Sequence, residues 1–326
     1  MNLDLYDKDL NRIAIIGEQY ISCLWSEGYN TIENFSLELV ETEEYRKKVR
    51  SDCYVGRADR KTFMIIKTVE ITNGKIVASG KQAGRVLDDV AFIGTIASGS
   101  MIDTSIKNAY NSSNKYNKLE FADTNLGVKY QSQISNKSIL ELCTKMCQSS
   151  DVGFKVTKDN GSLLASFYKP ERKSHLVFSE KFGNIIVDSI SMSTENLKNY
   201  AIVLGAGEGD DRTKVYVDKT NGGDRRTLIV DANDIKPEEN ETTQSYNDRL
   251  SARGVEKLLE NQRTFSCSFT PYENDFGTKY DLGDILILFL TDYGIKLESR
   301  VSKFTQKSQN NKTETTVEVG QVTIRR

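Results

Sequence analysis

Hydrophobic and polar residues alternate along several stretches of the chain, the pattern of a strand with one face on a core and the other in solvent. The alternation is strict over residues 35–39 (FSLEL) and 265–269 (FSCSF), where it places the Phe, Leu and Cys side chains on one face. It recurs over residues 295–301. These three segments are therefore predicted to be half-buried strands.

Two further features also predict β structure. The longest apolar run, residues 285–290 (ILILFL), is typical of a strand that is buried on both faces. Six residues are too few to span a bilayer, which takes about 20. Asn73 and Gly74 separate two β-rich segments, TFMIIKTVEIT and KIVASG, and this dipeptide is a strong hairpin signal. We therefore expect a β-meander over residues 52–80.

Apolar residues at helical spacing predict four helices, over residues 81–96, 100–110, 138–147 and 243–262. The predicted apolar stripes consist of Val86, Leu87, Val90 and Ile93 in the first segment, Ile139, Leu142, Cys143 and Met146 in the third, and Tyr246, Leu250, Val255, Leu258 and Leu259 in the fourth. Residues 108–118 and 231–243 are polar, which predicts two exposed connections. The whole pattern predicts an α+β fold that is mostly β.

The segment 201–212 (AIVLGAGEGDDR) contains closely spaced glycines, as phosphate-binding loops do. A dinucleotide fingerprint requires G-x-G-x-x-G between a strand and a helix, but here the third glycine, Gly209, comes one residue early and a strand pattern follows. No helix N-terminus is available for a phosphate, and Asp210 and Asp211 would repel one. We therefore expect two strands joined by a turn whose glycines adopt positive φ, and no nucleotide binding.

The composition offers little catalytic chemistry. His175 is the only histidine among 326 residues, so neither a Ser-His-Asp triad nor a histidine-rich metal site is expected. The net charge of −2 provides no broad basic surface for a nucleic acid. The N-terminal residues lack the apolar core of a signal peptide. We expect no enzyme activity, no cofactor and no metal, and we expect reduced, buried thiols at Cys23, Cys53, Cys143, Cys147 and Cys267.

Several motifs resemble, in their order along the chain, the hub proteins of phage tails. Residues 199–217 (NYAIVLGAGEGDDRTKVYV) are similar to that family's strand, G-x-G-E-G turn, acidic residue, Arg and second strand. Residues 280–288 (YDLGDILIL) resemble its Asp-x-Leu-Gly-Asp strand entry. Residues 246–260 resemble its helix, with matching residues at Tyr246, Leu250, Arg253, Gly254 and Leu258.

The N-terminal part of the chain fits the same family less closely. Tyr6 and Asp7 match its Tyr-Asp start, and residues 22–25 precede the FSLEL strand as expected. Where the family has Gly-Asp or Gly-Glu before the phenylalanine of that strand, this chain has Glu33 and Asn34. The resemblance therefore covers nearly the whole chain, with one departure.

The resemblance implies a structural protein of the tail tip, or baseplate, of a phage or a phage-like bacteriocin, assembled in the bacterial cytoplasm. It implies two small tube-like β-barrel domains with an inserted α/β region: a first barrel at 1–80, the insertion at 81–195, and a second barrel at 196–326 that includes the helix near 243–262. Such hubs form homotrimeric rings that adapt a six-fold tail tube to a three-fold central spike or tail fibre. The implied partners are therefore the tail tube protein, the spike or fibre and other baseplate proteins, with no specific nucleic acid and no membrane insertion.

The family motifs supply the candidate site residues, which we interpret as structural: Gly205, Gly207, Gly209, Asp211, Arg212, Leu282, Gly283 and Asp284. Gly283 can turn the chain at positive φ, Leu282 can anchor to the core, and Asp284 can accept bonds from turn amides. Arg212 can pair with Asp210 or Asp211 across the turn, or with a residue across a subunit boundary. Two other functions stay open, a host-surface glycan-binding module and a tail-associated cell-wall hydrolase.

Overall fold

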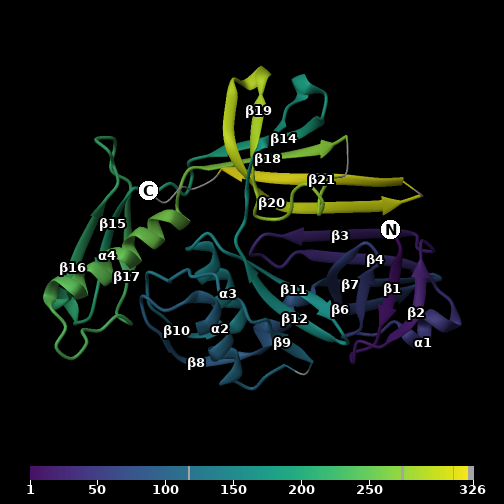
Figure 1. Cartoon of the computed structure of the whole chain (residues 1–326), viewed down its shortest axis with the longest axis horizontal. Helices are drawn as coiled ribbons and strands as arrows, with labels where there is room; N and C mark the ends of the chain where they lie inside the picture. The colour runs from purple at the N-terminus through teal and green to yellow at the C-terminus, as the bar shows by residue number, and fades with distance from the viewer. Residues whose placement is uncertain (117, 273–274, 311, 322–326) are drawn as a thin grey trace.

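Strand pairing dominates the computed structural model, which describes residues 1–116, 118–272, 275–310 and 312–321 (Figure 1). Within these residues, 16 strands join one sheet, and two smaller sheets contain two and three strands. The α+β, mostly β fold predicted from the sequence is confirmed. The closure of each β region into a barrel stays a prediction.

The N-terminal β region, residues 1–82, is an antiparallel sheet in the order β2-β1-β5-β6-β7-β4-β3. Asn73 (φ 53°) and Gly74 (φ 77°) form the predicted hairpin between β6 and β7, because both accept the positive φ of this turn. Its elements are β1 (Leu3–Tyr6), β2 (Arg12–Gly17), β3 (Ser22–Gly28), β4 (Asn34–Val40), α1 (Glu43–Lys48), β5 (Tyr54–Arg57), β6 (Arg60–Thr72) and β7 (Lys75–Gln82).

The α/β region, residues 83–168, packs two helices against strands that extend the large sheet beyond β6. Its elements are η1 (Ala83–Asp89), β8 (Ala91–Ile96), α2 (Ile102–Asn111), β9 (Leu119–Phe121), β10 (Ile134–Ser138), α3 (Ile139–Gln148), β11 (Gly153–Asp159) and β12 (Ser162–Tyr168). The helix predicted over 81–96 is wrong: the chain forms a short 3-10 helix and then strand β8, which pairs with β10. Ile93, expected on the apolar stripe, is 83% exposed.

The C-terminal β region consists of strands from two separated parts of the chain, in the order β13-β19-β20-β21-β18-β14. Its elements are β13 (Arg172–Phe178), η2 (Glu180–Phe182), β14 (Ile185–Ser193), β18 (Thr264–Pro271), β19 (Ile285–Leu290), η4 (Thr291–Tyr293), β20 (Ile295–Gln309) and β21 (Lys312–Gln321). The strands predicted at 265–269, 285–290 and 295–301 are confirmed. Since β13 and β14 pair with β19 and β18, we propose that this region begins near Arg172 rather than at 196.

The α4 lobe, residues 199–262, lies at one side of the molecule (Figure 1). One face of its three-stranded sheet, in the order β16-β15-β17, packs against a single long helix. Its elements are β15 (Tyr200–Leu204), η3 (Gly209–Asp211), β16 (Lys214–Asp218), β17 (Thr227–Asp231) and α4 (Thr243–Glu260), whose N-cap is Thr242. The lobe therefore separates β14 from β18 in sequence although the two strands pair in space.

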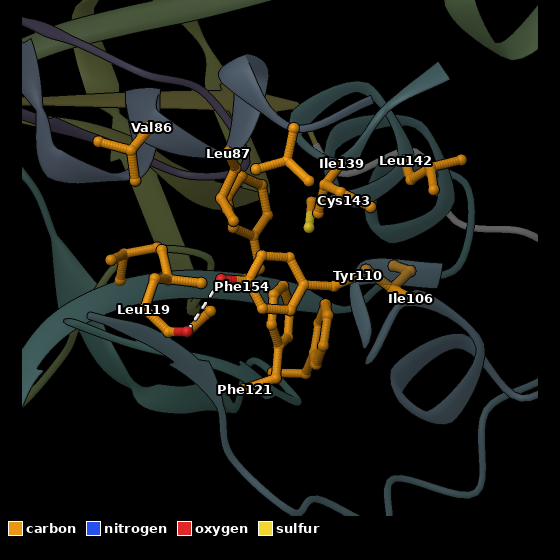
Figure 2. Packing of buried hydrophobic residues seen from close by; sticks show 14 of the residues in the cluster. Val86, Leu87, Ile106, Tyr110, Leu119, Phe121, Ile139, Leu142, Cys143 and Phe154 are labelled. Atoms are coloured by element: carbon orange, nitrogen blue, oxygen red, sulfur yellow. Dashed lines mark hydrogen bonds between the residues drawn. The ribbon is translucent and has the colours of Figure 1, made fainter. Parts of the chain in front are cut away.

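Each region has its own cluster of buried side chains. In the α/β region, Tyr110 lies between Phe121 and the α3 residues, and its hydroxyl donates a 2.9 Å hydrogen bond to the Leu119 carbonyl (Figure 2). This bond satisfies a buried phenol. All five cysteines are buried and free, as predicted. Burial raises the pKa of Cys143 and Cys147 well above the ordinary thiol value, so neither is a reactive thiolate.

Strand β20 joins the two β regions into one sheet. Its second half pairs with β3 in antiparallel register, from Lys303 opposite Gly28 to Gln309 opposite Ser22. Beneath this seam, Arg60 of β6 lies 4.4 and 4.5 Å from the ring centroids of Phe276 and Phe304. The Arg60 Nε also lies 3.5 Å from the buried Glu27 carboxylate.

These contacts cross between two hydrophobic cores. Phe276 and Phe304 belong to the C-terminal β region, whereas Glu27 accepts a 2.9 Å hydrogen bond from the Trp25 indole in the N-terminal core. The side chains of Glu27 and Arg60 are 3% and 12% exposed, so water screens their attraction weakly. The pair holds the Arg60 guanidinium in place, and its contacts with Phe276 and Phe304 fix one β region on the other.

Replacing Arg60 should therefore weaken the seam strongly. Arg60→Ala leaves the Glu27 carboxylate buried without its cation and removes both ring contacts, so we expect a loss of about 3 kcal/mol in the free energy of unfolding. Urea denaturation of the full chain measures it. Arg12→Ala breaks an exposed pair with Asp4 and should change stability by less than about 0.5 kcal/mol. Equal effects of the two variants would contradict the role given to Arg60.

Candidate functional site

The glycine turn, residues 205–213, is closed by the side chain of Arg212. Its Nε donates to the Gly205 carbonyl at 2.9 Å, and its Nη2 donates to the Leu204 carbonyl at 2.6 Å. The same Nη2 lies 2.5 Å from Asp231 Oδ1, at the end of the neighbouring strand. Within the chain, the predicted pairing of Arg212 with Asp210 or Asp211 is therefore wrong, because the guanidinium points back into the sheet. The Arg212 hydrogen bond lowers the pKa of the Asp231 carboxyl.

The three glycines of the turn serve different purposes. Gly207 (φ 118°) and Gly209 (φ 54°) adopt the positive φ that the sequence predicted. Gly205 is required by packing instead, since a Cβ there would lie 2.6 Å from the Tyr246 hydroxyl and 2.7 Å from Leu250 Cδ1. The glycine turn packs tightly against α4 at Gly205. The residues at its tip, from Gly207 to Asp211, are exposed.

Helix α4 packs closely on this sheet because of one glycine, Gly254, and one buried phenol, that of Tyr246. A Cβ on Gly254 would lie 2.6 Å from Val203 Cγ2 and 2.8 Å from Val217 Cγ2, so glycine permits the close approach of the helix to β15 and β16. The Tyr246 hydroxyl accepts from the Ala206 amide at 2.8 Å and donates to the Ile235 carbonyl at 3.0 Å. The G-x-G-E-G motif and the helix motif thus pack directly against each other.

Two arginines on the flank of α4 connect the helix to the α/β region. Arg253 Nη2 donates to the Gln133 carbonyl at 2.5 Å and lies 3.1 Å from Asp234 Oδ2. Arg249 binds Glu241 through Nε and Nη2, at 2.9 and 2.6 Å, and its Nη1 donates to Gln133 Oε1 at 3.1 Å. These contacts hold the lobe in place relative to the α/β region.

The helix motif included Arg253, but sequence reasoning missed Arg249 and Glu241. The only feature of the sequence that could have indicated this pair was the opposite charge of the two residues near the predicted N-terminus of the helix. The Arg249 hydrogen bond lowers the pKa of Glu241 to about 2.

A cavity of about 960 Å³ lies between α4, the α/β region and the residues that flank β15 and β16. Its lining includes Tyr130, Ser149, Leu197, Val255 and Glu256. The Tyr130 hydroxyl donates to Glu256 Oε1 at 3.2 Å, and burial, together with this carboxylate, raises the pKa of Tyr130. Glu256 Oε2 is buried without a hydrogen-bond partner, and Arg253 Nε lies 3.8 Å from it, so one carboxylate oxygen beside the cavity is only weakly compensated.

The second motif forms a corner at the entry of strand β19. Gly283 has φ 86°, and Leu282 is 8% exposed within the C-terminal core, as predicted. Asp284 accepts from the Asp281 amide at 3.0 Å, as predicted, and also from the Glu171 amide at 2.8 Å. Asp284 therefore fastens the chain where it leaves the α/β region to the start of β19.

This corner also meets the N-terminal β region. A Cβ on Gly283 would lie 2.4 Å from Tyr29 Cε2, so the glycine again permits a close approach. The Tyr168 hydroxyl donates to the Leu282 carbonyl at 3.0 Å, and Arg300 Nη1 donates to the Gly283 carbonyl at 2.8 Å. Three regions of the fold thus converge at the corner.

The structure places the predicted site residues in two groups. Gly205, Gly207, Gly209, Asp211 and Arg212 lie together in the glycine turn, and Leu282, Gly283 and Asp284 lie together at the corner. The two groups belong to different cores and do not form one site. Asp211 is exposed at the tip of the turn. Their chemistry is that of turns and close packing.

Two further observations concern metal sites and membrane-spanning helices. Among the described residues, no group of three or more His, Cys, Asp and Glu side chains is arranged to hold a metal ion. Across the same part of the chain, no helix has the length and apolar character needed to cross a membrane.

Comparison with known proteins identifies relatives of the whole chain. The model of the Siphovirus ReqiPepy6 Gp37-like protein family matches residues 2–321. No curated protein matches the sequence.

Similar solved structures include prophage tail protein gp18 from Listeria monocytogenes EGD-e (12% identity, TM-score 0.62, 98% of this chain and 94% of that chain). A tail protein from Neisseria meningitidis MC58 is similar to the same degree (12%, 0.62, 98% and 96%). The 43 kDa tail protein of prophage MuSo2 from Shewanella oneidensis is also similar (13%, 0.60, 98% and 98%). The fold is that of these tail proteins, and the resemblance to phage tail proteins indicated by the motifs is confirmed.

Enlarging Gly254 tests the fit of α4 on the sheet. Alanine at an open helix position stabilises a protein by about 0.5–1 kcal/mol relative to glycine. Here the added methyl would collide with Val203 and Val217, so Gly254→Ala should lower the free energy of unfolding by about 1–3 kcal/mol. Ser251→Ala, on the same helix, should stay within about 0.5 kcal/mol. Urea denaturation distinguishes the two, and a stabilised Gly254→Ala would refute the packing argument.

The ion pair of Glu241 and Arg249 should make the lobe sensitive to acid. The folded-state pKa of Glu241 is about 2, below its ordinary value of 4.5. Its stabilising contribution is therefore fully present above about pH 5 and is lost as the pH falls from about 4.5 to 2. In urea denaturation, Glu241→Gln should be less stable than the unchanged protein at pH 6, and the two should converge near pH 2. Glu239→Gln, in the same connection, should give a difference that does not vary with pH.

Proposed function

Because this chain belongs to the Siphovirus ReqiPepy6 Gp37-like protein family, we propose that it is a structural hub protein of a phage tail tip or baseplate. In this proposal three copies form a ring that adapts the six-fold tail tube to a three-fold central spike or tail fibre. The tail tube protein, the spike or fibre and other baseplate proteins are its partners. The protein acts by assembly rather than by catalysis.

One observation carries the proposal: the chain contains two β regions that share a continuous sheet. The β3–β20 ladder and the Arg60 contacts fix the two regions relative to each other. Each chain therefore presents two β units in a defined geometry, and three chains present six. A closed ring with three-fold symmetry would match a six-fold tube in this way.

The motif residues support a scaffold. Arg212 closes the glycine turn, Gly205 admits α4, and Asp284 fastens the corner where three regions meet. Each group binds backbone or packs tightly, and neither leaves a nucleophile beside a base. The similarity in fold to three tail proteins, two of them from prophages, supports the same interpretation.

The proposal assigns different parts of the chain to different tasks. Residues in 1–80 and 199–326 are expected to form the contacts between subunits, and residues 81–195 are expected to be more peripheral. Unpaired strand edges of the two β regions would then be covered by neighbouring subunits, which protects them from non-specific pairing.

A map of the assembled tail by electron cryomicroscopy tests the proposal. We expect three copies of the chain in one ring at the tail tip, with N-terminal and C-terminal β regions alternating around the channel. Multi-angle light scattering of the purified full chain would report whether the ring forms without partners. One, two or six copies at the tail tip would contradict the proposal, as would a position outside the tail.

A glycan-binding screen and a peptidoglycan hydrolysis test separate the two alternatives. The purified full chain is expected to bind no host glycan and to release no peptidoglycan fragments. Saturable glycan binding or hydrolysis would favour a host-surface module or a cell-wall hydrolase instead.

A further inference from the structure

The sheet of the α4 lobe has one uncovered face. Helix α4 packs on the other face through Leu250 and Gly254. α4 also contacts the α/β region, through Arg249 and Arg253 on its flank and through Glu256 on the side facing away from the sheet, where Tyr130 donates a hydrogen bond to it. The sheet and the α/β region thus lie on opposite sides of the helix, so the uncovered face points away from the rest of the chain.

Strand register defines the composition of this outer face. Ile202 on the central strand lies opposite Tyr216 on one neighbour and Ile229 on the other. Tyr216 is 59% exposed and Ile229 is 68% exposed. Tyr200 and Leu204 continue the apolar row along the central strand, because residues two apart point to the same face. Five large apolar side chains therefore form a continuous patch, and at its Tyr200 end the Arg225 guanidinium lies 3.9 Å from the ring centroid.

Polar residues surround this patch at its corners. In the same registers, Tyr200 lies between Asp218 and Thr227, and Leu204 lies between Lys214 and Asp231. An apolar centre with a polar rim is the usual anatomy of a protein–protein interface. Contiguous exposed apolar patches of this kind mark interaction sites.

The end of the face beside the glycine turn is acidic. Glu208, Asp210 and Asp211 are exposed there, next to Asp231. The nearby cations are already engaged, since Arg212 binds Asp231 and two carbonyls, and Lys214 lies 3.9 Å from Asp210. The Arg212 contacts fix the turn that carries these carboxylates, so the negative charge has a defined position.

We propose that this outer face is a docking surface for another tail protein, which inserts an apolar side chain among Tyr216, Ile202 and Ile229 and places Lys or Arg residues against the acidic turn. Charge complementarity selects a basic partner over a nucleic acid, whose phosphates the same turn repels. This proposal depends on the proposed function in one respect, namely that the partner is a protein of the tail.

Cysteine labelling of the assembled tail tests this proposal. All five native cysteines are buried, so Ile229→Cys introduces one accessible thiol. A maleimide should label it rapidly in the purified chain and at least about tenfold more slowly in intact tails, as expected when most copies are covered. Ile93→Cys, at a position that is 83% exposed in the α/β region, reports whether the reagent reaches the particle.

A photo-crosslinker attached to the thiol of the Ile229→Cys variant identifies what covers the face. The expected product joins position 229 to a peptide of another tail protein that contains Lys or Arg beside an apolar residue. A product within a second copy of this chain, or with a peptide lacking basic residues, would overturn the proposal. So would unchanged labelling of the introduced thiol in tails that contain the protein. Absence of the chain from tails would count against the proposed function instead.

Charge reversal supplies an independent readout. Asp210→Lys combined with Asp211→Lys should lower the number of complete tails and should leave the unfolding midpoint of the purified chain unchanged. Glu239→Lys, an exposed reversal elsewhere on the lobe, should assemble normally. Equal assembly of both variants would remove the electrostatic part of the proposal.

Discussion

The pairing of β20 with β3 determines how the rest of the molecule is arranged. A single 15-residue strand pairs first with β19 and then with β3 on one edge, while β21 lies along its other edge. Backbone hydrogen bonds thereby extend from one β region into the other. The Arg60–Glu27 contact and the stacked rings of Phe276 and Phe304 add side-chain contacts at the same place. Without this seam the two regions would be linked only through the α/β region and its corner at Asp284.

The feature common to the two motif groups is close approach. Gly205, Gly254 and Gly283 each lie where a methyl group would strike a neighbouring side chain within 2.4 to 2.6 Å. Positive φ explains Gly207 and Gly209 but does not explain Gly205. A glycine-rich segment after a strand can therefore resemble a phosphate loop while its function is to bring a helix onto a sheet. The element that follows decides between the two, and here it is strand β16 rather than a helix.

Local patterns in the sequence predicted about half of the strands and helices, but not their long-range partners. Alternation identified β4, β18 and β20, and the Asn73-Gly74 dipeptide fixed a hairpin, because both signals depend on neighbouring residues. The helix predicted over 81–96 was wrong because the spacing of its apolar residues fits both a helix and a 3-10 turn followed by a strand. Pairing of β8 with β10 selects the strand, and the local sequence does not show that pairing. The motifs located both turns. The pairing of Arg212 with Asp231, and that of Arg60 with Glu27, depends on contacts that no local pattern encodes.

The separation of β3 and β20 along the chain has a consequence for synthesis. The two strands lie far apart in sequence, as the hydrogen bond between Tyr20 and Ser308 illustrates with a separation of 288 residues. During synthesis, β3 leaves the ribosome early, and one edge of β3 stays unpaired until β20 has been made. An unpaired strand edge in this interval can pair with the wrong strand. Ser22, Ser26 and Glu27 make that waiting edge polar. The α4 lobe, whose hydrophobic core lies within residues 199–262, can fold in the meantime, so we expect the closing of the seam to be the last step of folding.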